Sequence, residues 1–177
     1  MYSTAELVRA AKDVTWLDKR RSGIVTITVN GSLIDLRDQK PLYPGKMRLQ
    51  GGWTFADLIR QLNDRIFFWP GGDDGPISSG VRHYQRYKGT AIVIMRVRTQ
   101  HVLSTNRSAI PLFCKYNSGS PRPTGGKGSP RGPSTFVECH SAPYTPSKVV
   151  ELTFANMIQL PRQIESSAGP FGPWTIH

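Results

Sequence analysis

Two short runs of alternating apolar and polar residues flank an Asn-Gly pair near the N-terminus. The runs cover residues 23–29 and 33–36, and Asn30-Gly31 lies between them. Asn-Gly between two alternating runs is the strongest short-range signal for an antiparallel hairpin. A chain that contains this hairpin has to build part of its core on an antiparallel sheet. Residues 37–39 then follow the second strand, where side chains can be held rigidly at the rim of a pocket.

Helices are predicted where apolar residues recur at spacings of three and four. The predicted helices are residues 3–12, with Thr4 as the cap, residues 54–65, with Thr54 and Asp57 as a capping box, and the basic segment 79–88 with His83, Tyr84 and Tyr87. Short apolar or alternating runs predict strands at residues 66–69, 90–98, 109–115, 135–137 and 148–154. We therefore expect an α+β fold with a mainly antiparallel sheet and a few flanking helices, as a single domain over residues 1–177.

Residues 118–133 have a composition that excludes regular elements. The segment SGSPRPTGGKGSPRGP is dominated by Gly, Pro and Ser, and its three charged residues are all basic, namely Arg122, Lys127 and Arg131. A loop of this length inside a compact domain is usually functional or disordered. We therefore expect a long basic loop between two strands.

The charge of the chain is strongly positive and unevenly placed. The net charge is +11, and no acidic residue occurs between Asp74 and Glu138, a stretch that contains ten Lys and Arg residues. Such a surface suits a polyanion, with affinity that falls steeply with salt. The alternative is a solvated basic face that only aids solubility.

Several other classes of protein are excluded or disfavoured by the sequence. No apolar stretch approaches the ~18 residues of a membrane span, and the N-terminus has no continuous apolar segment typical of a secretory signal, so we expect a cytoplasmic protein with no membrane partner. Cys114 and Cys139 are too few for a disulfide framework. Together with His140 they could offer three metal ligands, but two ordinary thiols and a loop histidine are the simpler interpretation, and we expect no metal.

Glu151 is the most informative acidic residue. It lies within Val-Val-Glu-Leu-Thr-Phe, a strand otherwise built of apolar and β-branched residues. A carboxylate buried there is costly without a partner and therefore indicates function. The alternative is that the period of two points Glu151 to solvent, with Val149 and Thr153 on the same face.

Three further segments could bind a ligand. Arg37 could grip a pyrophosphate through its guanidinium fork, or simply pair with Asp35 or Asp38 at the end of the strand. The aromatic run that includes Phe68 and Trp69 could flank a ring, although such runs are more often core. The turn at Asn117-Ser118 could supply hydrogen bonds to a ligand, or merely reverse the chain.

Five blocks in a fixed order carry a family resemblance. These are LIDLRDQKPL, WTFADLIRQLNDRIFFWP, YNSGS, SPRGPSTFVE and KVVELTF. Together they resemble an uncharacterised family of bacterial domains with RDQ-P, LN-R-FFWP, NSG, PRG-TF and VVEL motifs, over roughly residues 3–165. The layout of that family in turn resembles the DarT group of DNA ADP-ribosyltransferases.

The resemblance implies a function and a set of site residues. The function is transfer of ADP-ribose from NAD to a nucleic-acid or protein acceptor, with an antitoxin-like protein as a further partner. Glu151 would be catalytic, and the NAD-binding residues would be Arg37, Gln39, Phe68, Trp69, Asn117 and Ser118. Arg122, Lys127 and Arg131 on the long loop would contact the nucleic acid.

One block of the resembling domains has no counterpart here. Such domains begin with a strand that carries a Tyr-His-x-Thr-like motif, whereas this chain opens at Met1-Tyr2-Ser3-Thr4. We therefore expect an N-terminally shortened domain with weak or no activity. The residues leave open whether the chain is an enzyme; the alternatives are a non-enzymatic nucleic-acid-binding module and an interaction domain with incidental charge.

Overall fold

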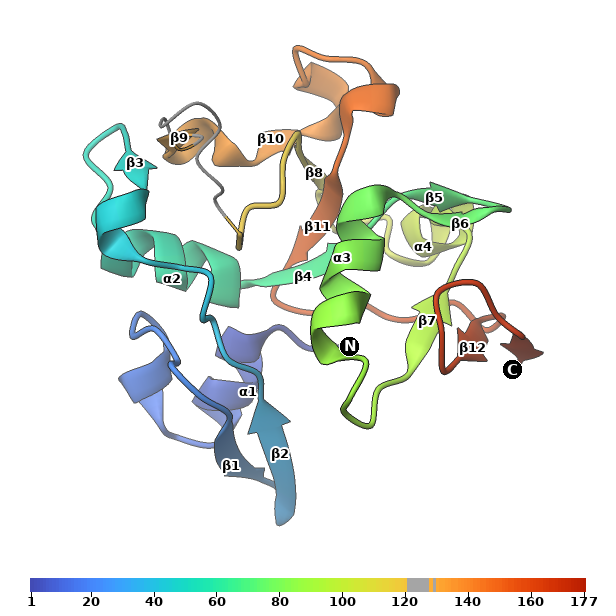
Figure 1. The fold of residues 1–177 in the computed structure, drawn as a ribbon, viewed down its shortest axis with the longest axis horizontal. Helices are drawn as coiled ribbons and strands as arrows, with labels where there is room; N and C mark the ends of the chain where they lie inside the picture. Colours follow the sequence, from blue (N-terminus) through green and yellow to red (C-terminus); the bar gives the residue numbers. More distant parts are fainter. Residues whose placement is uncertain (121–127, 129) are drawn as a thin grey trace.

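The computed structural model describes residues 1–120, 128 and 130–177, and in this part of the chain it has an α+β architecture (Figure 1). The α-helices are α1 (Thr4–Ala10), α2 (Phe55–Asn63), α3 (Ser78–Tyr87) and α4 (Thr99–Thr105). The longer strands are β1 (Val25–Val29), β2 (Ser32–Leu36), β4 (Arg65–Phe68), β7 (Ile94–Arg96), β8 (Leu112–Cys114), β11 (Glu151–Ala155) and β12 (Glu165–Ser167). The two-residue strands are β3 (Arg48–Leu49), β5 (Gly71–Gly72), β6 (Gly75–Pro76), β9 (Pro130–Arg131), β10 (Val137–Glu138) and β13 (Thr175–Ile176).

The N-terminal layer consists of α1 and the predicted hairpin, which is confirmed. β1 and β2 pair antiparallel, and Asn30 and Gly31 have φ angles of +50° and +80°, as a tight hairpin turn requires. Helix α1 packs on the hairpin through Val8, which forms a small buried core together with Ile27. The predicted cap, Thr4, is wrong by one residue. The Ser3 hydroxyl accepts the hydrogen bond from the Glu6 amide, so Ser3 caps the helix.

Helix α2 begins as its sequence predicts. The Thr54 hydroxyl accepts a hydrogen bond from the Asp57 amide, and the Asp57 carboxylate accepts one from the Thr54 amide. The helix ends at Asn63 because Arg65 already belongs to β4. Its apolar stripe lies in the main core, whose buried members are Leu42, Leu58, Ile59, Leu62, Cys114 and Phe136.

The central sheet has the strand order β10-β8-β11-β4, and its described pairs are antiparallel. One face carries Ile66, Leu152 and Phe154, which form a second core with Val102 of α4. The opposite face carries Phe67 and Cys114, which belong to the α2 core. β11 is therefore a central strand with a core on each side.

Two elements differ from the predicted ones by more than a shift of their ends. The strand expected over residues 90–98 is limited to β7, and helix α4 follows it in a segment for which no element was predicted. β9 lies within the segment expected to hold no regular element, and it pairs in parallel with β3. A two-residue edge pair tolerates Pro130, because the pairing does not need a proline N–H. The amide of Gln50 donates to the Arg131 carbonyl over 2.8 Å.

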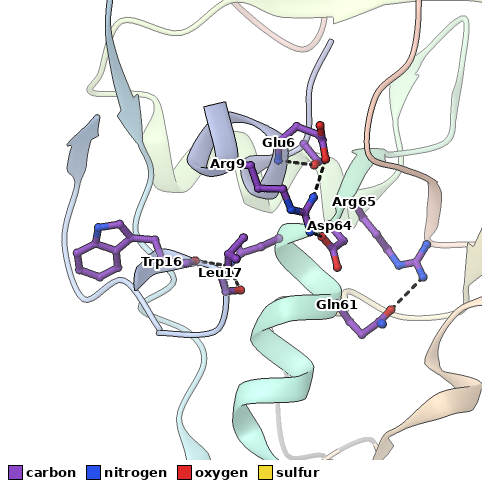
Figure 2. A network of polar contacts seen from close by, with 9 residues as sticks. Glu6, Arg9, Trp16, Leu17, Gln61, Asp64 and Arg65 are labelled. Atoms are coloured by element: carbon purple, nitrogen blue, oxygen red, sulfur yellow. Dashed lines mark hydrogen bonds and ion pairs between the residues drawn. The ribbon is translucent and has the colours of Figure 1, made fainter. Parts of the chain in front are cut away.

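Polar contacts join the N-terminal layer to α2 (Figure 2). The Arg9 guanidinium bonds Glu6 on its own helix and reaches Asp64 at the end of α2, at N–O distances of 2.6 and 3.0 Å.

In the described part of the chain no helix combines the length and apolar character needed to cross a membrane.

Candidate active site

Glu151, the first residue of β11, is buried with only 2% of its surface exposed. Its two carboxylate oxygens accept hydrogen bonds from the Ser118 amide at 3.2 and 3.1 Å. Val149 and Thr153 are buried as well, so the alternative that period-2 alternation points this face of the strand to solvent is wrong. The pairing with β4 and β8 covers the strand from both edges.

Burial dominates the electrostatics of this carboxylate. Loss of water raises the pKa of Glu151 to about 7, and contacts with Ser118 and the positive charge of Arg131 oppose part of the rise. Cys114 is the register partner of Glu151 on β8. Burial, and then the Glu151 charge, raise the pKa of the Cys114 thiol to about 12. Near neutral pH, Glu151 can therefore exchange a proton, whereas Cys114 stays protonated.

Arg131 fixes the turn that covers Glu151. Its guanidinium donates to the carbonyl oxygens of Ser118 (3.1 Å) and Asn117 (2.9 Å), and it stacks on the Tyr116 ring at 4.1 Å. Arg131 is 1% exposed, so it does not suit the phosphate contact expected of it. The other two expected nucleic-acid contacts, Arg122 and Lys127, lie outside the described residues.

Asn117 and Ser118 were expected to contact NAD, and the structure places them directly over Glu151. Ser118 is fully buried, and its side chain and its amide both act to lower the pKa of the Glu151 carboxyl. Gly119 and Ser120 continue the turn, where the Ser120 amide donates to the Asn117 carbonyl. The turn therefore places the Ser118 amide and hydroxyl next to a buried carboxylate.

The two aromatic candidates, Phe68 and Trp69, lie in different environments. Phe68 pairs with Leu152 across the β4–β11 ladder and packs edge-on against Phe154, at a ring distance of 6.1 Å, within the second core. Phe68 therefore packs against the second core. Trp69 follows one residue later, next in register to Glu151, and alternation places the two side chains toward the same face. Its indole N–H is buried and has no partner among the described residues.

A stack of side chains leads from Trp69 to Arg37. The Trp69 ring lies 4.3 Å from His83 of α3, His83 lies 5.1 Å from Tyr87, and the Arg37 guanidinium lies 4.6 Å from the Tyr87 ring. Burial, together with the charges of Arg37 and Arg86, lowers the pKa of His83 to about 4. His83 is therefore neutral at physiological pH. The alternative that Arg37 pairs with Asp35 or Asp38 is not what the structure shows, since Asp35 bonds Thr26 and Asp38 lies beside Lys40.

Gln39, the remaining expected NAD contact, is a structural residue. Its side chain accepts from the Arg21 amide and donates to the Asn63 carbonyl oxygen, both over 3.1 Å. Arg21 also donates to that Asn63 oxygen, and the Asn63 amide group donates to the carbonyls of Trp16 and Leu17. These five residues form a connected set, the Asn63 network. It satisfies buried polar groups where the N-terminal layer meets α2, and it uses both the oxygen and the nitrogen of the Gln39 amide.

Sequence reasoning placed His83 and Tyr87 on a basic helix but missed them as part of the site. Gly80, His83, Tyr84 and Tyr87 follow spacings of three and four, which place them on one face of α3. The Gly80 Cα lies so close to Trp69 that an added Cβ would lie 3.2 Å from the Trp69 Cβ. This spacing of a glycine and aromatic residues was the available signal.

Metal chemistry has no candidate site in the described residues. They form no group of three or more His, Cys, Asp or Glu side chains able to hold a metal ion, so Cys114, Cys139 and His140 do not meet. The His140 ring instead lies 3.0 Å from the Glu138 carboxylate.

Comparisons with known proteins give a family but no function. Neither the curated proteins nor the solved structures include a match to this chain. A family model described as a family of unknown function (DUF7002) matches residues 1–164, which is most of the chain. The chain therefore belongs to the DUF7002 family.

Proposed function

We propose that the chain is an ADP-ribosyltransferase-like domain that transfers ADP-ribose from NAD to a nucleic-acid acceptor, or to a protein. The observation that supports it most directly is Glu151, a buried carboxylate in a central strand whose pKa stays near 7 despite its contacts with Ser118 and the charge of Arg131. A structural role would require a full set of partners for a buried charge. A functional role explains why the cost of burying it is tolerated.

The reaction needs a carboxylate of this kind. The bond between the nicotinamide nitrogen and the ribose C1′ breaks, and its electron pair leaves with nicotinamide. A new bond forms between C1′ and the acceptor, which loses a proton. Positive charge develops on the ribose meanwhile, and the ionised Glu151 carboxylate stabilises it and accepts a hydrogen bond from a ribose hydroxyl. Low polarity around Glu151 strengthens both effects.

The surroundings of Glu151 suit a dinucleotide. Ser118 contacts the Glu151 carboxylate, and the buried Trp69 indole N–H, which has no partner among the described residues, follows β4, the neighbouring strand of β11. Arg37 at the far end of the aromatic stack is exposed, and its guanidinium suits a pyrophosphate. Because Glu151 is 2% exposed, its contact with a ribose requires the Asn117–Ser118 turn to move.

A second candidate function is a non-enzymatic module that binds nucleic acid. It is favoured by the stretch between Asp74 and Glu138, which contains no acidic residue and keeps exposed cations such as Arg86 and Lys88. Calorimetry distinguishes the two functions, because a non-enzymatic module would bind nucleic acid but would not bind NAD.

The test is label transfer from NAD. The protein is incubated with NAD labelled in its ADP-ribose part and with single-stranded DNA, RNA or a protein mixture. We expect labelled acceptor with the natural chain and a loss of at least about 100-fold with Glu151→Gln. Glu138→Gln is the matched control, because its carboxylate is 45% exposed and its expected transfer is unchanged. Transfer that persists in Glu151→Gln removes Glu151 from its role.

A further inference from the structure

Helix α3 has two chemically different faces. Its inner face holds His83 and Tyr87, which contact each other and link Trp69 to Arg37. Its outer face carries Arg82 and Arg86, four residues apart and both exposed. The inner face therefore anchors the helix through its rings, and the outer face is available to solvent.

The outer cations have no acidic partners. Arg82 donates to the Ser79 hydroxyl over 3.2 Å, and within the described part of the chain no carboxylate lies at ion-pair distance from Arg82, Arg86 or Lys88. Like charges four residues apart destabilise a helix by about 0.2–0.5 kcal/mol. Folding alone therefore gives no reason for this pair.

Arg37 extends the positive charge beyond the helix. It comes from the end of β2, yet its guanidinium lies over Tyr87 in the last turn of α3. Lys88 follows Tyr87 directly and is exposed as well. The effect of both Arg37 and Arg86 on the pKa of His83 places their charges around the same ring. We define these four cations, Arg37, Arg82, Arg86 and Lys88, as the α3 basic surface.

We infer that the α3 basic surface binds the phosphate backbone of a nucleic acid. Arginine guanidinium groups donate in a fork that matches phosphate oxygens, and unpaired cations release the counterions of a polyanion when they bind it. This inference rests on the proposed function in one respect, because it identifies the surface that would receive the nucleic-acid acceptor. Binding of the nucleic acid to this surface does not require NAD. Arg82, Arg86 and Lys88 supply the contacts to the strand, and because Arg37, assigned above to the NAD pyrophosphate, adjoins them, the bound strand would lie beside the candidate active site.

A nucleic acid fits this surface better than an anionic membrane does. The exposed residues of α3 and its first following residues are all polar or glycine, namely Ser78, Arg82, Gln85, Arg86, Lys88, Gly89 and Thr90. Amphipathic helices that bind membranes insert apolar side chains such as Leu, Phe or Trp. α3 keeps its aromatic residues on the inner face instead.

The experiment measures binding of a fluorescent single-stranded DNA of about 20 nucleotides by anisotropy, without NAD, between about 0.05 and 0.3 M salt. The variant is the double substitution Arg82→Gln and Arg86→Gln. The control removes the same charge elsewhere, with Arg48→Gln and Arg162→Gln, two exposed arginines outside the surface. Thermal unfolding confirms that both proteins keep the fold.

We expect the Kd of the α3 variant to rise at least about tenfold, and the slope of log affinity against log salt to fall by roughly 1.5. The control should stay within about twofold of the natural chain. Equal weakening in both variants, or no binding by the natural chain, would overturn the inference. Tighter binding to phosphatidylserine vesicles than to DNA would overturn it in favour of a membrane. The Glu151→Gln protein should bind DNA normally, so a failure of catalysis and a failure of this surface give different results.

Discussion

The Ser118 amide donates to both carboxylate oxygens of Glu151, at 3.2 and 3.1 Å. This contact ties the turn after β8 to the first residue of β11. Arg131 holds this turn in place, because its guanidinium donates to the carbonyl oxygens of Asn117 and Ser118. The buried charge of Glu151 therefore depends on a turn that the buried Arg131 keeps in place.

Cleavage of NAD should depend on the ionisation of Glu151. Its pKa of about 7 predicts that kcat/KM rises with pH and reaches half its maximum near pH 7, because only the carboxylate stabilises the developing charge. Release of nicotinamide measured from pH 5 to pH 9 gives the profile. A rate already maximal at pH 5 would contradict a perturbed Glu151.

Stability should depend on pH through the same group. The folded pKa of Glu151 is raised from 4.5 to about 7, so its contribution is complete below pH 4.5 and is lost as the pH rises toward 7. Glu151→Gln removes this loss and should become more stable relative to the natural chain, by about 3 kcal/mol at pH 8 compared with pH 4.5. Urea denaturation at both pH values measures the difference. Glu138→Gln, with its exposed carboxylate, should show no such trend.

His83 should titrate near pH 4. Its pKa is lowered from 6.5, so the unfolded chain takes up the proton first and stability falls as the pH drops from 6.5 toward 4. An NMR titration of the His83 ring reports the midpoint directly. Arg37→Gln removes one of the two nearby positive charges and should move that midpoint upward. An unchanged midpoint in this variant would mean that Arg37 does not lie over the stack in solution.

Asn63→Ala should destabilise the fold by about 3 kcal/mol. The substitution leaves Arg21, the Gln39 amide and the carbonyls of Trp16 and Leu17 without their shared partner. Urea denaturation measures the loss. Gln100→Ala on the exposed surface of α4 is the control and should change stability by less than about 0.5 kcal/mol. A similarly small effect for Asn63→Ala would show that water replaces the network.

Elements with local signals were predictable. The Asn30-Gly31 pair fixes the hairpin through the φ angles of two adjacent residues, and the Thr54–Asp57 capping box fixes the start of α2 within one turn. Helix α4 was missed because it is seven residues long and has no side-chain cap. Its position is determined by Val102, which packs into the second core.

Contacts between distant segments were not predictable from the sequence. The parallel pairing of β9 with β3 joins residues about 80 positions apart, and nothing local in Pro130-Arg131 indicates a strand. The burial of Glu151 depends likewise on β4 and β8 covering both edges of β11. Alternation alone fits an exposed and a buried glutamate equally well. Gln39 and Asn63 each belong to a motif block, but their contact is visible only in the fold.

The Asn63 network lies between the small N-terminal core around Val8 and Ile27 and the larger core of α2. Apolar surfaces can slide past one another at little cost, whereas the directional bonds at Asn63 permit one docking geometry. We expect loss of this contact to release the hairpin, whereas the segment that begins α1 keeps its own bond from the Ser3 amide to the Asn156 carbonyl. The amide hydrogens of β1 and β2 should therefore exchange with solvent as one cooperative unit, sooner than those of β11.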